Sequence, residues 1–114
     1  MGRESLGDLE HLVLLALVRL DGETYGVPIL DEISARTGRE ISRPAVYIAL
    51  RRLEGKGLLT SRLGDATPER GGRAKRYFRI TKSGVGALQT SRAALVSMWD
   101  RIEHLIEPRR RGHR

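Results

Sequence analysis

A run of basic and aromatic side chains lies between residues 42 and 54, at the spacing of a helix. Tyr47 and Arg51 are four residues apart, so in a helix they project from the same face. Arg43 and Pro44 stand at the start of this segment, where the free backbone N–H groups of a helix attract phosphate. An arginine guanidinium can bind phosphate or the edge of guanine through two parallel hydrogen bonds. These residues therefore predict the binding of a polyanion.

A second group of cations lies in and directly after a glycine-rich segment, residues 64–74. Arg70 and Arg73 belong to this segment, and Lys75 follows it. The segment is longer than a tight hairpin needs, and long loops in compact domains are often functional. Arginine in such a loop can reach the DNA backbone or a narrow minor groove, whose negative potential attracts it.

The formal net charge of +7 is unevenly distributed. Residues 1–42 carry four basic and eight acidic residues, a net charge of −4. Residues 43–79 carry ten and three, a net charge of +7, and residues 80–114 carry seven and three, a net charge of +4. A basic middle beside an acidic first third is typical of a polyanion-binding surface on a stable scaffold. Charge alone leaves open a generally basic protein with no such partner.

The polyanion-binding segment has the marks of a complete helix over residues 43–55. Ser42 is a natural N-cap, and Pro44 is tolerated in a first turn. Gly55 and Gly57 end the helix. The stripe expected to face the core consists of Val46, Ala49, Leu50 and Leu53.

Periodicity also predicts the elements that must position this helix. Apolar residues three and four apart predict helices over residues 6–20, 25–37 and 82–107. Residues 58–63 and 75–80 have the composition and alternation of strands. The expected N-terminal caps of the three helices are, in order, a capping box of Ser5 with Asp8, then Thr24, and then Thr81 or Ser83.

Two helices joined by a short turn and followed by a hairpin describe a winged helix-turn-helix, whose second helix enters the major groove. The fold class expected is mainly α with a small β-hairpin, completed by a long C-terminal dimerisation helix. Residues 1–80 would form the DNA-binding region and residues 81–107 the dimerisation helix of the same compact domain. Residues 108–114 are expected to be a basic disordered tail.

Three stretches, in this order, resemble the PadR family of bacterial transcriptional regulators, specifically its short subfamily with a single C-terminal helix. They are residues 24–26 (Thr-Tyr-Gly), residues 46–58 and residues 71–84. The resemblance covers roughly residues 6 to 106. It implies a homodimer that binds palindromic operators in double-stranded DNA and usually represses a nearby gene. It also implies that the C-terminal helix packs against the partner's N-terminal helix.

The site residues expected from this interpretation fall into two groups. Those expected to contact DNA are Ser42, Arg43, Pro44, Tyr47, Arg51, Arg52, Arg70, Arg73 and Lys75. Those expected at the dimer interface are Leu9, Val13, Leu17, Leu88, Leu95, Trp99, Ile102 and Ile106. Packing is the alternative role for Tyr47, and pairing with a nearby acid is the alternative for Arg52.

Trp99, the single tryptophan, lies on a heptad seam of the last helix and is first expected in the dimer core. The resemblance implies a second role, because some related regulators stack flat hydrophobic compounds on an interface aromatic. A ligand-responsive regulator is therefore one alternative function. A winged helix that binds protein instead of DNA is another.

Other classes find no support in the sequence. Cysteine is absent, and His11, His104 and His113 lack metal-ligand spacing, so we expect no metal and no cofactor. Residues 71–75 lack the Lys-Ser/Thr ending of a phosphate-binding loop, and no catalytic motif is present, so an enzyme is not expected. No apolar run approaches the ~20 residues of a membrane span, and a cytoplasmic protein with no membrane partner is expected.

Overall fold

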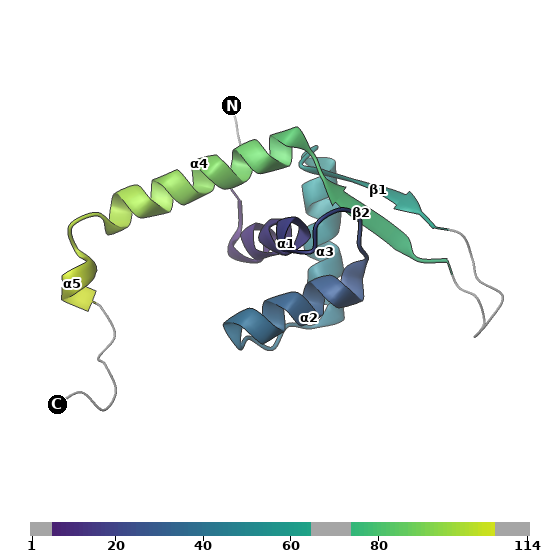
Figure 1. Cartoon of the computed structure of the whole chain (residues 1–114), viewed down its shortest axis with the longest axis horizontal. Coiled ribbons are helices and arrows are strands. Elements are labelled where there is room, and N and C mark those ends of the chain that lie inside the picture. Colours follow the sequence, from purple (N-terminus) through teal and green to yellow (C-terminus); the bar gives the residue numbers. More distant parts are fainter. Residues whose placement is uncertain (1–5, 65–73, 107–114) are drawn as a thin grey trace.

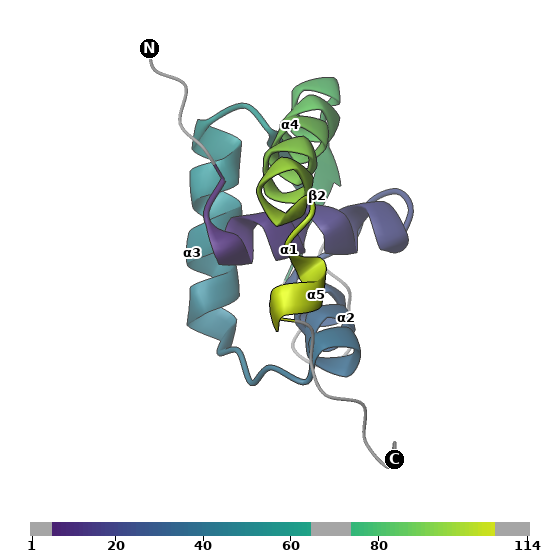
Figure 2. The same ribbon diagram turned by 90° about the vertical axis from the view of Figure 1, so that its left-hand side faces the viewer.

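The computed structural model describes residues 6–64 and 74–106. Helices α1 (Asp8–Arg19), α2 (Gly26–Thr37) and α3 (Arg43–Gly55) form a three-helix body in which each helix contacts the other two. Figures 1 and 2 show α1 lying across α3, with α2 below it. The buried core draws on all three helices, both strands' inner faces and the start of the last long helix: Val13, Leu14, Ala16, Leu17, Ile29, Ile33, Val46, Ala49, Leu50, Leu53, Leu59, Phe78 and Leu88.

The prediction for α3 is confirmed at both ends. Ser42 is its N-cap, and the Ser42 Oγ accepts a hydrogen bond of 3.2 Å from the backbone N–H of Ala45. All four residues of the predicted stripe are buried, so the rest of the helix surface faces outward. The helix that carries the candidate contacts is thus held by local capping and by the core together.

The start of α1 differs from the prediction. The helix begins at Asp8 with Gly7 as its N-cap, and the carboxylate of Glu10 accepts a hydrogen bond of 3.0 Å from the backbone N–H of Gly7. The capping residue is therefore Glu10 instead of the predicted Asp8, and Ser5 lies outside the described residues.

The hairpin consists of β1 (Leu59–Leu63) and β2 (Arg76–Ile80), which pair antiparallel with Leu59 opposite Ile80. Each strand is one residue shorter than predicted. The backbone of Thr24 pairs with Phe78, so the turn before α2 extends this small sheet by one residue. Thr24 is therefore a sheet residue, and the N-cap of α2 is Tyr25 instead.

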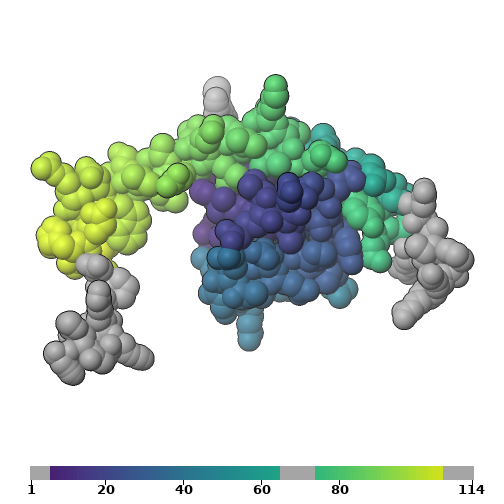
Figure 3. Space-filling view, viewed as in Figure 1, coloured from purple at the N-terminus to yellow at the C-terminus, as the bar shows by residue number. Residues whose placement is uncertain are grey.

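Helix α4 (Lys82–Trp99) starts at the predicted cap, where the Thr81 Oγ1 accepts from the Gly84 N–H at 3.0 Å. Only its first half packs on the body, and the rest projects beyond it (Figures 1 and 3). The prediction of one helix to residue 107 is wrong, because α4 ends at Trp99 and a short α5 (Glu103–Ile106) follows.

The helix ends beyond the part that the body supports. Every residue from Arg92 to Ile106 is exposed, and a helix without tertiary contacts depends on weak local propensity. Asp100, a poor helix former, leaves the helical conformation, and Arg101 has a left-handed φ of 69°. Within the described residues, no helix has the length and apolar character needed to cross a bilayer.

Candidate nucleic-acid interface

The outward face of α3 carries the cations and the tyrosine that the sequence singled out. Arg43, Arg51 and Arg52 are exposed, and Tyr47 is 37% exposed among them. Ile48 is 53% exposed on the same helix and adds an apolar contact surface. Ser42 and Pro44 are exposed at its N-terminal end. One helix therefore presents hydrogen-bond donors, positive charge and an apolar side chain to the solvent.

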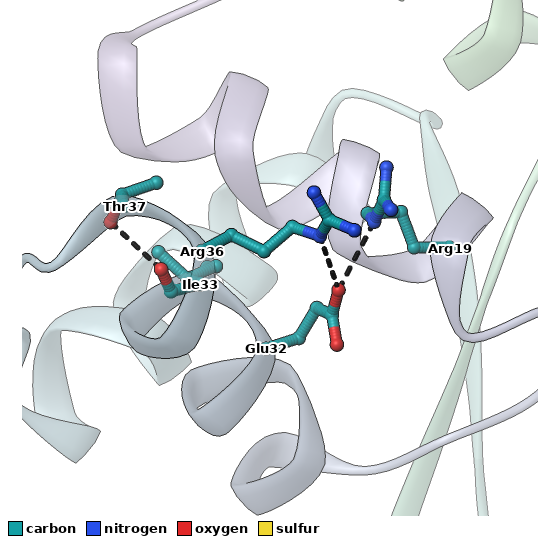
Figure 4. A network of polar contacts seen from close by, with 5 residues as sticks. All are labelled: Arg19, Glu32, Ile33, Arg36 and Thr37. Atoms are coloured by element: carbon teal, nitrogen blue, oxygen red, sulfur yellow. Dashed lines mark hydrogen bonds and ion pairs between the residues drawn. The ribbon is translucent and has the colours of Figure 1, made fainter.

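Three arginines of α1, α2 and the segment between α2 and α3 are paired with acids. Arg19 and Arg36 both bind the carboxylate of Glu32, at 3.1 and 3.2 Å (Figure 4). Arg39 pairs with Asp8 at 2.6 Å.

The cations of α3 differ from these. Within residues 6–64 and 74–106, Arg43, Arg51 and Arg52 form no ion pair. Arg52 lies close enough to Glu10 to lower the pKa of that carboxyl, but the acid's ion-pair partner is Lys56. The positive charge on the outward face of α3 is thus left to attract an external anion.

A nearly buried ion pair fastens the end of α3 to the start of α1. Lys56 Nζ lies 2.8 Å from Glu10 Oε1, and the two side chains are 24% and 9% exposed. Burial raises the pKa of Glu10, but the hydrogen bonds from Lys56 and from the Gly7 N–H lower it by more. The pKa of Glu10 is therefore below its ordinary value. The carboxylate stays charged at neutral pH and holds the C-terminal end of α3 against α1.

Tyr47 leans against the first residue of α2. A Cβ atom at Gly26 would lie only 2.3 Å from the Tyr47 hydroxyl oxygen and 2.4 Å from its Cζ. Because Gly26 has no side chain, the tyrosine ring occupies that space. The two roles weighed for Tyr47 are therefore combined: part of the ring packs on α2, and part is exposed beside Arg51.

The base of the wing is a stack of rings and cations. The rings of Tyr25 and Tyr77 meet edge to face with centroids 5.7 Å apart. Lys75 Nζ lies 5.0 Å from the centroid of Tyr25, and the Arg62 guanidinium lies 5.2 Å from that of Tyr77. Arg62 also forms three hydrogen-bond contacts of 2.8–3.1 Å with the carboxylate of Glu23, which lower the pKa of that carboxyl. Lys75 is therefore held at the base of the wing and remains exposed.

The other predicted wing residues, Arg70 and Arg73, lie outside the described residues. Gly26, Tyr77 and the Glu10–Lys56 pair support the site without having been predicted to do so. Gly26 was the one available signal, because glycine is a residue that permits a close approach to the backbone.

Among the residues expected at the dimer interface, some are buried within the chain itself. Val13 and Leu17 are 0% and 1% exposed and Leu88 is 8% exposed, so their contacts are already made in the core of one subunit. The apolar spacing that suggested an interface at these three positions reflects packing in the core of the chain itself. Leu9 is half-buried against the same core.

The remaining expected interface residues are exposed on α4, on α5 and in the turn between them. Leu95, Trp99, Ile102 and Ile106 are between 39% and 59% exposed. An open groove of about 510 Å³ runs between α1 and α4, beside a 2.9 Å hydrogen bond between Ser91 and His11. Its lining includes Leu15, Leu88, Arg92, Leu95, Val96, Trp99 and Glu103.

The three-helix body, the paired hairpin and the basic face of α3 together define a winged helix-turn-helix protein of the DNA-binding class. Comparison with known proteins identifies the family. The profile of the transcriptional regulator PadR-like family matches residues 14–90, and the chain belongs to this family. It is therefore a transcriptional regulator.

Individual relatives agree with this assignment. The chain is 40% identical over 77 residues to the transcriptional regulator Rv3488 of Mycobacterium tuberculosis, a match that covers 66% of this chain and 65% of that protein. It is 32% identical to an uncharacterized protein of Lysinibacillus sphaericus, over 89% of this chain and 86% of that one.

Solved structures show the same fold. A PadR family regulator from Eggerthella lenta matches with a TM-score of 0.65 and 29% identity, over 90% of this chain and 88% of that one. A transcriptional regulator from Clostridium thermocellum matches with a TM-score of 0.71 and 23% identity, over 87% and 93% of the two chains.

Proposed function

We propose that the chain is a homodimeric, sequence-specific repressor, which places α3 of each subunit in a major groove of a palindromic operator near the gene it controls. The observation that carries this proposal is the exposed cationic face of α3, where Arg43, Arg51 and Arg52 form no ion pair within the described residues. Unpaired, they are free to displace counterions from DNA.

The residues of α3 and of the wing would have different tasks. Arg51 and Tyr47 face the groove and read bases or adjacent phosphates. Ser42, Arg43 and Pro44 bring the N-terminal end of the helix to the backbone, where the helix dipole favours phosphate. Lys75 supports the wing on the backbone and carries no sequence information.

The test is a fluorescence-anisotropy titration of a labelled duplex from the region upstream of the chain's own gene, at several KCl concentrations. Two subunits with four exposed cations each, on α3 and at Lys75, could make about eight phosphate contacts, and these alone correspond to a slope of log K against log salt of about −7. Arg51→Ala should weaken operator binding more than binding to random DNA, whereas Lys75→Ala should weaken both alike. Arg19→Ala, which removes a paired scaffold arginine, is the matched control and should change neither. Affinity independent of salt, or an Arg51→Ala variant indistinguishable from the control, would contradict the proposal and favour a protein-binding winged helix.

The homodimer is proposed from the exposed apolar surface of α4 and α5. Large apolar side chains there are 39–75% exposed: Leu95, Val96, Met98, Trp99, Ile102, Leu105 and Ile106. A patch of this extent on one projecting arm marks an interaction surface, and a second copy of α4 and α1 would cover it.

Leu95→Asp should therefore give a monomer in sedimentation velocity at micromolar concentration. Ser83→Asp, exposed at the other end of α4, is the control and should remain dimeric. A dimeric Leu95→Asp variant would contradict the proposed interface.

A ligand-responsive regulator is the second candidate, favoured by the exposure of Trp99 in the groove between α1 and α4. The indole is 45% exposed beside apolar side chains and the carboxylate of Glu103, a combination suited to a flat, cationic, hydrophobic compound. Because Trp99 is the only tryptophan, its fluorescence reports on this groove alone. Rhodamine 6G should quench it and fluorescein, which is anionic, should not. Equal quenching by both dyes, or by neither, would contradict the ligand role.

A further inference from the structure

Three consecutive residues before and at the start of α2 contact both elements that are proposed to touch DNA. Thr24 is joined to Phe78 of β2 by two backbone hydrogen bonds of 3.2 and 2.7 Å. Tyr25 packs on Tyr77 of the wing. The next residue, Gly26, lies against the ring of Tyr47 on α3. One tripeptide, residues 24–26, therefore contacts both the wing and α3.

We propose that Tyr25 and Gly26 are positioning residues of the DNA interface: Gly26 determines where the Tyr47 hydroxyl lies, and Tyr25 holds Lys75 at the base of the wing. The inference rests on the proposed contacts of Tyr47 and Lys75 with DNA. It goes beyond them because neither Tyr25 nor Gly26 is required to touch DNA.

The geometry at Gly26 indicates which part of the molecule would yield to a side chain. The atoms that a Cβ would meet are the hydroxyl oxygen, Cζ and Cε2 of Tyr47, at 2.3, 2.4 and 2.9 Å. These are the far end of a side chain that is 37% exposed, so the ring can swing outward while α2 and α3 stay in place. Alanine at position 26 should thus displace the Tyr47 hydroxyl with little effect on the fold.

The ring of Tyr25 supports a different side chain, that of Lys75. The ammonium of Lys75 lies 5.0 Å from the centre of the Tyr25 ring, within the range of a cation–π interaction. The same ring meets Tyr77, which also covers Arg62. Without the Tyr25 ring, the flexible Lys75 side chain would lose its support and would be ordered only when it binds.

A double-mutant cycle tests the first half. Tyr47→Ala should weaken operator binding about tenfold, the value of one hydrogen bond to a charged group. Gly26→Ala should cause a similar loss, and the double variant should bind no more than about twofold more weakly than Tyr47→Ala. Gly55→Ala, at the end of α3 in open space, is the matched control and should bind normally.

The outcomes separate the two proposals. If Tyr47→Ala binds normally, the proposed contact of Tyr47 fails, and the positioning role of Gly26 fails with it. If Tyr47→Ala weakens binding but Gly26→Ala does not, or if the two losses multiply, only the positioning role is overturned. If Gly26→Ala does not fold, the double variant, which lacks the colliding ring, must fold, and its failure to do so would overturn the inference.

The second half is tested by conservative replacement. Tyr25→Leu should weaken DNA binding about threefold in the unmodified chain and have no effect in the Lys75→Met background. Tyr25→Phe, which keeps the ring, should restore binding. Equal losses in both backgrounds, or a loss in Tyr25→Phe as large as in Tyr25→Leu, would overturn this role.

Discussion

Replacing Lys56 with methionine tests whether the Glu10–Lys56 pair holds α3 against α1. The change keeps the apolar stem and removes the charge. The Glu10 carboxylate, 9% exposed, would keep the 3.0 Å hydrogen bond from the Gly7 N–H. Breaking a fully buried ion pair by removing one partner costs about 3–5 kcal/mol. Because the Lys56 side chain is 24% exposed and water reaches it, we expect the free energy of unfolding to fall by about 2–3 kcal/mol.

The loss should depend on pH in a defined direction. In the unmodified chain the pKa of Glu10 is below its ordinary value of 4.5, because the hydrogen bonds from Lys56 and Gly7 outweigh the effect of burial. A depressed carboxyl pKa stabilises the folded state above the ordinary pKa, and this contribution is lost as the pH falls through the folded-state value. Lys56→Met removes the hydrogen bond and the charge of Lys56, both of which lower the pKa of Glu10, so this pKa rises relative to the unmodified chain. The difference in stability between the two chains should therefore be largest near pH 7 and shrink below pH 4.5.

The assay is urea unfolding followed by far-UV circular dichroism at pH 7 and pH 4, with one protein concentration throughout because dimerisation adds to stability. Arg39→Met is the control, since its pair with Asp8 has side chains 49% and 73% exposed and should contribute less than about 1 kcal/mol. The double variant Glu10→Gln/Lys56→Met should recover most of the lost stability, because no buried charge remains. The reasoning is refuted if Lys56→Met is as stable as Arg39→Met, or if the double variant is less stable than Lys56→Met.

Other positions give predictions that thermal unfolding can check. Gly86→Ala should stabilise α4 by about 0.5–1 kcal/mol, because nothing lies within 4 Å of its Cβ position. Gly84→Ala should instead destabilise the chain, since its Cβ would lie 2.2 Å from the backbone oxygen of Leu58; a Gly84→Ala variant as stable as Gly86→Ala would contradict this close contact. Leu50→Ala should cost about 2–5 kcal/mol by opening a cavity at a residue 1% exposed, and a loss below 1 kcal/mol would exclude a packed core there. Ser42→Ala should cost about 1 kcal/mol through loss of the α3 cap, and an unchanged melting temperature would show that the cap is dispensable.

The sequence predicted best those features that depend on neighbours along the chain. Helix α3 begins and ends where its cap and its glycine place the ends, because a cap and an apolar stripe are local patterns. The two strands, to within one residue each, and the start of α4 were predicted for the same reason. The basic outward face of α3 was also accessible from spacing alone, since Tyr47 and Arg51 are one turn apart.

Features that depend on contacts between distant segments could not be predicted from these local patterns. The contact of Gly26 with Tyr47 joins residues of different helices, and a glycine in sequence does not reveal what fills its space. The break after Trp99 lies in a segment without tertiary contacts, where the heptad spacing of the seam does not by itself maintain the helix. Val13 and Leu17 have the same apolar spacing whether their own core or a second copy covers them.

The distribution of ion pairs explains how one small chain can be both stable and strongly basic. Several acids of the first 42 residues bind cations of the scaffold: Glu10 binds Lys56, Glu23 binds Arg62 and Glu32 binds two arginines. Each pairing neutralises a cation that would otherwise compete for phosphate away from α3. Within the described residues of the three-helix body, positive charge without an acidic partner is thereby left on the outward face of α3. A DNA duplex that approaches the body is attracted to that face, so the acidic first third contributes to orientation as well as to stability.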